Sequence, residues 1–414
     1  MVYEDIRLEG HIIDSMVLPR VLDDILDLGG DFRFLSFRVG REKFDYSRAL
    51  IRVKAAGEVQ LEAILSRLQR HGAQAVEQVD AQLAPAPVDG VFPEGFYSTT
   101  NLETFVRVHG RWVPVAHPEM DCGIRLIATD ETAEANTIET DIAETVPISQ
   151  VKKGDFLVVG RRGVRVRPME RSREARTFEF MSSSVSSEKP KHLVIGEVAG
   201  LMRRMRDTGR KILAVVGPAV VHTGAAPALA GMVRDGWVDV VFGGNAVAVH
   251  DIEVCLYGTS LGINLERGLS EEGGHEHHLR AINRVRACGS ILQAVEQGVV
   301  DRGLFYELVK AGVPYVLAGS IRDDGPLPEV LTDAMEAQRA MREYARQAGM
   351  CLMLSTMLHS IAVGNLLPAS VRTVCVDINP AVVTKLSDRG SFQTIGIVTD
   401  VGLFLGELAQ DLAS

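Results

Sequence analysis

The sequence lacks several features that would place it in a broad class of proteins. Asp and Glu (54) outnumber Lys and Arg (44), and the formal net charge of −10 argues against a nucleic-acid partner and an anionic membrane surface. No apolar run approaches the roughly 18 residues of a membrane span. The first residues are acidic where a signal peptide is basic. We therefore expect a cytoplasmic protein that contacts neither nucleic acid nor membrane.

Cysteine is scarce and unpatterned. The five cysteines are an odd number, lie far apart and form no CxxC pair, so we expect reduced thiols that mostly serve as small core residues. A chain of 414 residues, 46% of them hydrophobic, has room for two or three globular domains. The cysteines are Cys122, Cys255, Cys288, Cys351 and Cys375.

Residues 1–85 alternate between strand and helix patterns. Apolar residues recur at helical spacing over residues 18–25 and 61–68. The strand patterns around them lie at residues 6–13, 33–40, 49–57 and 74–79. The order βαββαβ is that of a split βαβ unit, so we predict a ferredoxin-like α+β domain here.

Two segments mark further boundaries. Residues 83–95, LAPAPVDGVFPEG, are rich in proline and glycine, and residues 182–189, SSSVSSEK, resemble a polar linker. Between them, short β-like runs alternate with turn residues and no strong helix pattern occurs. We predict a small β-rich domain over residues 86–181.

Residues 182–414 have a different rhythm. Short, continuously apolar runs appear in turn, and most are followed by a helical pattern. Strands buried on both faces of a parallel sheet have this composition. We therefore predict a Rossmann-like α/β domain with a parallel sheet. The runs are KILAVVG, WVDVVFGG, VPYVLAGS, MCLMLS, RTVCVDIN and TIGIVTD.

The ends of these predicted strands are rich in Gly, Ser, Thr, Asn and Asp. Ligands of open α/β sheets bind beyond the carboxyl ends of the strands. Small residues let a ligand approach the backbone, and helix N-termini offer N–H groups to phosphate. The segments are residues 217–218, 243–246, 320–325, 355–359, 377–380 and 399–401.

Asp377 fits two roles. It follows a strand and precedes Pro380, which suits the first position of a helix, so it can be a helix cap. It also stands where a dinucleotide-binding sheet holds the adenosine ribose. No neighbouring arginine suits a 2′-phosphate, so the second role favours NAD over NADP.

The HEHH segment at residues 275–278 invites a metal interpretation. It lacks the i, i+4 spacing that puts two imidazoles on one helix face, and no Cys or further His lies at a familiar interval. We expect no metal site and place these residues at a helix N-terminus beside a substrate cleft. Arg280, Arg284 and Arg286 would follow on that helix, either as ligands of a substrate carboxylate or as solvated surface.

Several long motifs together resemble a known family. They are GGNAVAVHDIE, GGHEHHLRAINRVRACGSI, GSIRDDGPLPEV and the STMLH turn at residues 355–359. In the same order they resemble the archaeal-type ornithine cyclodeaminases, also labelled lysine-oxoglutarate reductase/saccharopine dehydrogenase-like proteins. The likeness extends over essentially the whole chain, including PEMDCGIR at residues 118–125. The same module is similar to the C-terminal part of cyanobacterial arginine dihydrolases, and its sheet resembles the NAD-binding fold of deoxyhypusine synthase.

The resemblance implies a reaction and a set of residues. L-ornithine would become L-proline and ammonia by transient hydride transfer to bound NAD+, intramolecular cyclisation and re-reduction. The large N-terminal domain of the dihydrolases has no counterpart here, so arginine hydrolysis is not implied. The family's cofactor contacts correspond to Asn245, Ala246, Asp324, Thr356, Met357, Leu358, His359, Asp377, Asp400 and Val401.

Proton transfer in such a reaction needs an acid and a base. We choose His250 and Asp251 as catalytic residues, since His titrates near neutrality and a carboxylate can orient it or hold the δ-ammonium. The alternative is that His250 is only packed on the first helical turn after the glycine pair. Gly243 and Gly244 would let the cofactor approach the backbone, and Glu253 would face the substrate.

Two other functions fit the same sequence. One is an NAD-dependent amino-acid dehydrogenase of saccharopine type, and the other is a nucleotide-binding amino-acid sensor that uses the ferredoxin-like unit. A ferredoxin-like unit joined to an α/β domain also leads us to expect a homo-oligomer.

Overall fold

The computed structural model describes residues 1–42, 45–76, 79–128, 140–168, 191–265, 268–269, 274–323, 325–388 and 394–413. The chain forms two compact units, Met1–Ser182 and Ser183–Ser414. Across the described residues, no helix combines the length and apolar character that a membrane crossing needs. None of the five cysteines forms a disulfide and four of them are buried, which confirms the prediction of reduced thiols that are mostly core residues.

The first unit begins with a four-stranded antiparallel sheet in the order β2-β3-β1-β4. Strand β3 lies between β1 and β2, which confirms the split βαβ topology. The apolar faces of its two helices pack on this sheet in one core cluster. The elements are β1 (Val2–Gly10), α1 (Val17–Asp27), β2 (Asp31–Arg38), β3 (Ser47–Ala55), α2 (Glu58–Gln69) and β4 (Gln74–Ala75).

A second sheet of seven strands completes the first unit, in the order β11-β6-β7-β9-β8-β10-β5. In the part of this region that the structure describes, the single helical turn is η1 (Ile148–Gln150), in keeping with a β-rich composition. Strand β5 precedes the predicted boundary at residue 85 but pairs with β10 of this sheet. The strands are β5 (Gln82–Pro85), β6 (Glu103–Val108), β7 (Arg111–Ala116), β8 (Gly123–Ala128), β9 (Thr140–Val146), β10 (Phe156–Val159) and β11 (Val164–Arg167).

The second unit is built on a seven-stranded parallel sheet in the order β17-β16-β13-β12-β18-β19-β20. Without the short edge strand β17, this is the order 3-2-1-4-5-6 of doubly wound dinucleotide-binding sheets. The direction of winding reverses between β12 and β18, so the switch point lies there. The strands are β12 (Lys211–Val216), β13 (Val240–Gly244), β16 (Tyr315–Ala318), β17 (Val330–Leu331), β18 (Ala348–Leu354), β19 (Arg372–Asp377) and β20 (Thr394–Val398).

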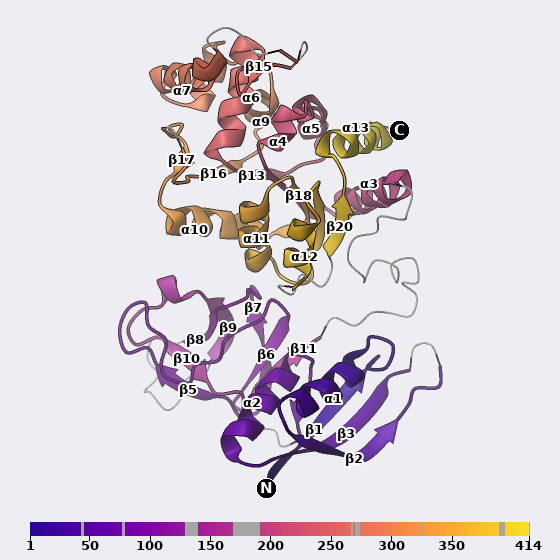
Figure 1. Ribbon diagram of the computed structural model, residues 1–414. Coiled ribbons are helices and arrows are strands. Elements are labelled where there is room, and N and C mark those ends of the chain that lie inside the picture. The colour runs from indigo at the N-terminus through magenta and orange to yellow at the C-terminus, as the bar shows by residue number, and fades with distance from the viewer. Residues whose placement is uncertain are drawn as a thin grey trace. The chain divides into compact units, whose positions relative to one another are not determined.

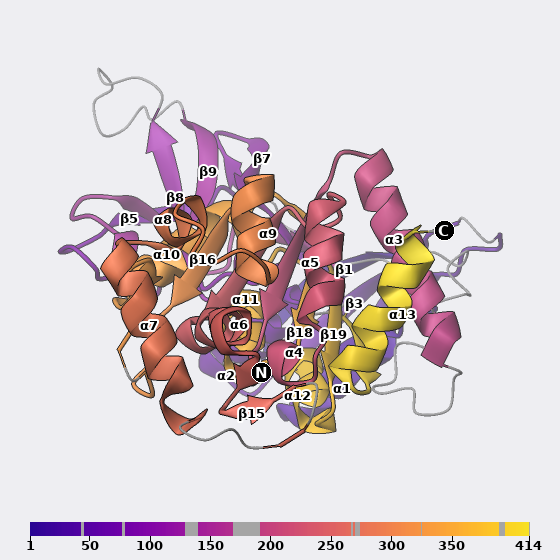
Figure 2. The ribbon, with the colours of Figure 1, turned by 90° about the horizontal axis from the view of Figure 1, so that it is seen from above.

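Helices cover both faces of the parallel sheet. Figures 1 and 2 show α10, α11 and α12 on one face and α3, α5, α9 and α13 on the other. The hairpin of β14 (Thr259–Ser260) and β15 (Ile263–Asn264) follows α6. The helices are α3 (Lys191–Asp207), α4 (Ala219–His222), α5 (Ala226–Arg234), α6 (Asn245–Tyr257), α7 (His277–Cys288), α8 (Ile291–Glu296), α9 (Leu304–Ala311), α10 (Ala334–Ala345), α11 (Met357–Leu366), α12 (Pro380–Asp388) and α13 (Val401–Ala413).

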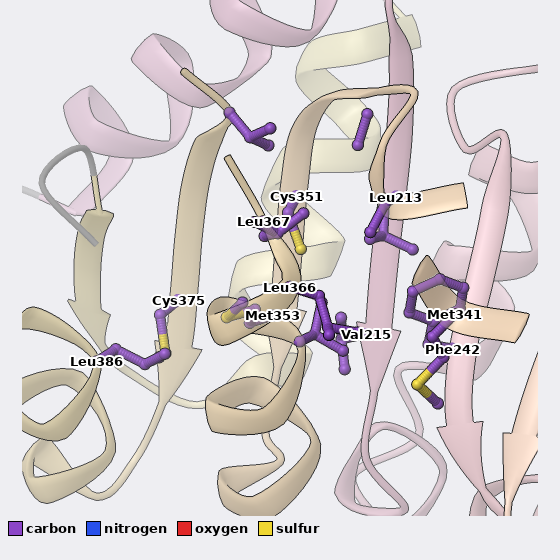
Figure 3. Close-up of a cluster of buried hydrophobic side chains, with 14 of the residues drawn as sticks. Leu213, Val215, Phe242, Met341, Cys351, Met353, Leu366, Leu367, Cys375 and Leu386 are labelled. Carbon is purple, nitrogen blue, oxygen red and sulfur yellow. The ribbon is translucent and has the colours of Figure 1, made fainter. Parts of the chain in front are cut away.

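The core between the sheet and α10–α12 is apolar and closely packed. Figure 3 shows Val215 and Phe242 from the strands together with Met341 and Leu366 from the helices. Phe242 is fully buried in this cluster. Such a core fixes the strands rigidly, so their carboxyl ends form a stable rim for a site.

Candidate functional site at the carboxyl rim of the parallel sheet

The loops after β12 and β18 approach each other closely at the switch point. The backbone N–H of Gly217 donates to the carbonyl of Leu354 at 2.9 Å. A Cβ at Gly217 would lie 2.0 Å from the carbonyl oxygen of Ser355, so this position has room for glycine alone. Ser355 itself adopts a left-handed conformation with φ of 50°. Backbone strain of this kind is stored where the surrounding structure enforces it, often at functional sites.

Helix α11 begins at this switch point without a side-chain cap. Its N-cap residue, Thr356, makes no capping hydrogen bond within the described part of the chain. The next two residues are apolar and exposed, Met357 at 37% and Leu358 at 72%. An open helix N-terminus suits a phosphate group, and exposed apolar side chains beside it suit a flat ring.

The helices after β19 and β20 differ, because each is capped by its own chain. Asp377 accepts from the N–H of Asn379 at 2.8 Å, and α12 begins at Pro380, as predicted. Asp400 accepts from the N–H groups of Gly402 and Leu403 at the start of α13. Asp377 was predicted as a possible cap of α12, but the cap is Asn379, whose side-chain oxygen accepts from the N–H of Ala381 at 3.0 Å. Asp377 instead forms a turn with Asn379 before the helix. Val401, the first residue of α13, is buried.

The glycine pair at the end of β13 is explained by packing. A Cβ at Gly243 would lie 2.7 Å from Cγ1 of Val247, and one at Gly244 would lie 2.9 Å from Cε1 of His359. The absence of a Cβ at these two glycines leaves room for the side chains of Val247 and His359. The sequence led us to expect that it leaves room for the cofactor. Burial lowers the pKa of His359 despite the nearby Asp323 carboxylate.

Asn245 and Ala246 open α6 directly after these glycines. Asn245 is buried, and its side-chain oxygen accepts from the N–H of Leu327 at 3.0 Å. This bond joins the start of α6 to the loop that follows β16. Ala246 is partly buried. Asp324, which was predicted to contact the cofactor, lies outside the described residues.

His250 and Glu253 form a buried pair one turn apart on α6. Nδ1 of His250 lies 2.8 Å from Oε2 of Glu253. An ionised carboxylate can only accept a hydrogen bond, so Nδ1 of His250 carries the proton. In the neutral tautomer of the ring, Nε2 then carries no proton and can accept one. The sequence predicted Asp251 as the partner of His250, but Glu253 occupies that position.

Glu253 is fixed by three further donors from the hairpin after α6. The Thr259 hydroxyl and the N–H of Gly262 donate to Oε1 at 2.9 and 3.0 Å, and the N–H of Leu261 donates to Oε2 at 3.2 Å. Burial would raise the pKa of Glu253, but the hydrogen bonds from His250, Gly262 and Thr259 together lower it. Glu253 is therefore a fixed, ionised group inside the protein.

Two other histidines adjoin this pair. Nδ1 of His277 lies 2.8 Å from the Thr259 hydroxyl, which already donates to Glu253, so His277 is the donor. The ring of His222 lies 4.8 Å from that of His250, and its Nδ1 contacts the Ser260 hydroxyl at 2.7 Å. Burial and then the nearby His250 lower the pKa of His222 to about 4. We call His222, His250, Glu253 and His277 the histidine cluster.

Asp251 has a different environment from the histidine cluster. Its carboxylate is buried and accepts from the N–H groups of Leu304 and Phe305 at 3.0 and 2.9 Å, at the start of α9. Burial raises the pKa of Asp251 to about 6, although both hydrogen bonds oppose the shift. These contacts attach α6 to α9.

The sequence identified part of the histidine cluster. His277 was noted in the HEHH segment, but its link to Glu253 through Thr259 was not, because the two lie in different elements. His222 was missed, although α4, of which it is the last residue, follows β12 at the same rim. Of the arginines on α7, Arg280 pairs with Glu276 and Arg286 donates to the carbonyl of Pro326. Within the residues that the structure describes, no three His, Cys, Asp or Glu side chains are grouped to hold a metal ion.

Family models match almost the full chain. Residues 196–408 match the Rossmann-fold region of the arginine dihydrolase ArgZ-like C-terminal part, and residues 103–195 match its first region. Residues 3–102 match the conserved region of the bifunctional LOR/SDH enzyme. A protein of Methanocaldococcus jannaschii named ornithine cyclodeaminase is 52% identical, over 100% of this chain and 96% of its own length. This chain belongs to the ornithine cyclodeaminase family.

Solved structures of related proteins also match this chain over its full length. Apo ArgZ, an arginine dihydrolase of the cyanobacterial ornithine–ammonia cycle, matches with a TM-score of 0.85 and 41% identity, over 100% of this chain and 58% of its own. The complex of AgrE with ornithine and NAD+ matches with a TM-score of 0.53 and 43% identity, over 100% of this chain and 57% of its own. This chain therefore spans a little over half of these two larger proteins.

Proposed function

We propose that this protein is an ornithine cyclodeaminase that converts L-ornithine to L-proline and ammonia with NAD as cofactor. The proposal rests on one observation: an archaeal protein named ornithine cyclodeaminase is 52% identical to this chain over 100% of its residues. A relative with 43% identity binds ornithine and NAD+. Production of proline would place the enzyme in proline biosynthesis and ornithine breakdown, and we further propose that it works in the cytoplasm as a homo-oligomer.

The carboxyl rim suits a dinucleotide. The strand order, the uncapped start of α11 and the narrow passage at Gly217 are features of a dinucleotide-binding crevice. Asp377 ends the strand that follows α11, about 20 residues after the β18 turn, which is the usual interval to a ribose-binding carboxylate. Leu358 at the start of α11 and Ile378 after β19 are both exposed and offer apolar surface to a base.

Each rim residue has a proposed role in holding NAD. Backbone N–H groups of residues 356–359 would hold the diphosphate, and Asp377 would hold the adenosine ribose. Asp400 and Val401 would line the same edge from α13, and Asn245, Ala246 and Asp324 would line the opposite half of the rim. When bound, NAD supplies a reversible acceptor for the hydride on the α-carbon of ornithine.

We propose His250 as the general base. With Nδ1 donating to Glu253, Nε2 is available to take a proton from the α-ammonium of ornithine. The fixed charge of Glu253 stabilises the imidazolium that results. His222, neutral above about pH 4, adjoins this ring without adding a competing positive charge.

The second proton-transfer step, protonation of the departing ammonia, needs a donor. The imidazolium of His250 can donate the proton that it has taken to the departing ammonia, which returns His250 to its neutral form. His277, joined to Glu253 through Thr259, would keep the carboxylate in place during both transfers. Asp251 was predicted to share this chemistry, but its contacts with α9 suit a positioning role, in which it holds α6 in place.

Proline formation tests the proposal. The purified protein is incubated with L-ornithine and NAD+, and proline and ammonia are measured together with absorbance at 340 nm. We expect equal amounts of proline and ammonia with no lasting rise in absorbance, because the reaction has no net redox change. A stoichiometric rise in NADH would instead identify an amino-acid dehydrogenase. Thermal stabilisation by ligands without any turnover would identify a sensor.

A further inference from the structure

A cavity of about 440 Å³ lies in the first unit, whereas the sheet that carries the proposed chemistry belongs to the second unit. Strand β1, the end of α2 and the edge strand β4 form one side of it. The turn between β10 and β11 and Trp112 of β7 form the other. Its volume is in the range of small-molecule sites. The function proposed above gives this cavity no role.

Most charged groups that line the cavity are already neutralised. Glu4 accepts two hydrogen bonds from Arg161, at 3.1 and 2.8 Å, and Asp5 accepts two from Arg52, at 2.7 and 2.9 Å. Arg161 also pairs with Glu62 at 2.9 Å. The two acidic side chains of the lining therefore attract no further cation strongly.

Two arginines of the lining, in contrast to these neutralised groups, pair with no carboxylate among the described residues. Arg162 is exposed and has no hydrogen bond or ion pair with the described residues. The guanidinium carbon of Arg165 lies 4.7 Å from the ring centroid of Trp112 and 4.8 Å from that of Phe105. Arg165 likewise pairs with no carboxylate among the described residues. Burial and then repulsion from Arg167 lower the pKa of Arg165, so a bound anion would relieve an unfavourable charge.

The rings restrict how Arg165 can bind a ligand. A guanidinium stacked on aromatic faces keeps its N–H groups for partners in its own plane. The N–H groups along one edge of the guanidinium match a carboxylate, which is planar and accepts two parallel hydrogen bonds. Gln69 and Gln74 add amide groups to the lining, and Leu65 and Val76 add apolar surface. A small organic acid fits this combination better than a bare inorganic ion.

We propose that this cavity binds a small carboxylate, of the size of an amino acid or a short dicarboxylic acid, with Arg165 and Arg162 as its anion-binding residues. The surplus of unpaired positive charge over unpaired negative charge favours a net anionic ligand. L-glutamate or a dicarboxylate without the ammonium group would bind, and the cationic amino acid ornithine would not.

Trp112 provides a local reporter for the test. The chain has two tryptophans, and Trp237 lies in the second unit, so W237F leaves one tryptophan, at the cavity. This full-length variant is titrated with L-glutamate, glutarate, L-ornithine and inorganic phosphate while tryptophan fluorescence is recorded. We expect saturable changes with glutamate, glutarate or both, and none with ornithine. A response to phosphate alone, or to none of the four, would overturn the proposal.

Two matched variants locate the binding residue. Arg165 and Arg167 lie on the same strand and both stack on Phe105, but Arg167 pairs with Glu103 and does not line the cavity. In the W237F background, R165Q should raise the apparent Kd about tenfold or more, because a charge-assisted hydrogen bond is lost. R167Q should change it less than about twofold. R162Q, at an exposed side chain that packing does not constrain, should also weaken binding.

Equal effects of R165Q and R167Q, with none from R162Q, would show that the fluorescence change does not report binding at this cavity. Proline formation from ornithine is measured on the same variants. R162Q should retain turnover without added carboxylate, so a loss of binding there is separable from a failure of the proposed catalytic function.

Discussion

Nδ1 of His250 lies 2.8 Å from Oε2 of Glu253, and three donors from the hairpin after α6 hold that carboxylate. The pair is buried within a helix that begins at the carboxyl rim of the sheet. A base that is oriented by a fixed anion, close to a cofactor rim, is a common arrangement for proton transfer. This relationship leads to the first prediction.

E253Q should lower kcat for proline formation by about 100-fold, because a neutral amide no longer favours the Nδ1–H form of His250. KM for ornithine should change little if Glu253 acts through His250 and does not bind substrate. Steady-state kinetics of proline release separate the two constants. T259V is the companion variant, since it keeps the His250–Glu253 contact and breaks the link to His277. Wild-type kcat in E253Q would exclude the positioning role.

Asp251 should make stability depend on pH. Its pKa is raised to about 6 in the folded protein, above the value of an unfolded aspartate. The folded state then binds more protons between about pH 4 and 6, so this group's contribution to stability is full below pH 4 and is lost as pH rises. The loss is about 2–3 kcal/mol. Urea unfolding of D251N should lack this decline, and an unchanged pH profile would contradict the prediction.

His222 should make stability depend on pH in the opposite direction to Asp251, over an overlapping pH range. Its folded pKa of about 4 lies below that of an unfolded histidine, so its contribution to stability is full above about pH 6.5 and is lost as pH falls toward 4. H222N can keep a hydrogen bond to Ser260 and should flatten the acid side of the stability profile. H192N, on an exposed position of α3, is the control and should leave the profile as in the wild type.

G217A should disrupt the rim. The added Cβ would meet the carbonyl of Ser355 at 2.0 Å, so the loops after β12 and β18 must separate. We expect NAD to bind at least about tenfold more weakly, measured by calorimetry, and a Tm several degrees lower. G406A in α13, where no atom lies within 4 Å of the new Cβ, should leave both quantities near the wild-type values.

D377A should separate the two roles of Asp377. Loss of the turn to Asn379 alone would cost about 1 kcal/mol of stability. If Asp377 also holds the ribose, the Kd for NAD should rise about tenfold or more. D333A is the matched control, because Asp333 caps α10 through the N–H groups of Met335 and Glu336. Equal NAD affinity in D377A and D333A would mean that Asp377 only forms the turn before α12.

Six strands of the second unit were predictable because each is a short apolar run, and the structure places a strand in every one of these runs. Strand β17 and the β14–β15 hairpin were missed because two residues carry no periodic signal. The order of the strands could not be predicted from the sequence either, since it depends on which face of the sheet each connecting helix covers. The rule that ligands bind at carboxyl ends nevertheless selected loops that the parallel sheet brings to one edge, before the order was known.

The choice of Asp251 over Glu253 as the partner of His250 shows where reading along the sequence failed. Adjacent residues on a helix point about 100° apart, whereas residues i and i+3 share a face. Glu253 stands at i+3 from His250, so the spacing itself contained the signal. The partners of Asp251 on α9 lie more than 50 positions later in the chain, and no local pattern could reveal them.

Helix α6 buries nine of its thirteen residues, including His250, Asp251 and Glu253. The same helix is thus both structural core and proposed reaction chemistry, and a substitution on it changes folding and turnover together. Directed evolution toward other diamino acids would therefore gain little from libraries on α6. The exposed side chains beside the histidine cluster, Leu261 and Ile263 of the hairpin and Leu279 of α7, are the places to diversify.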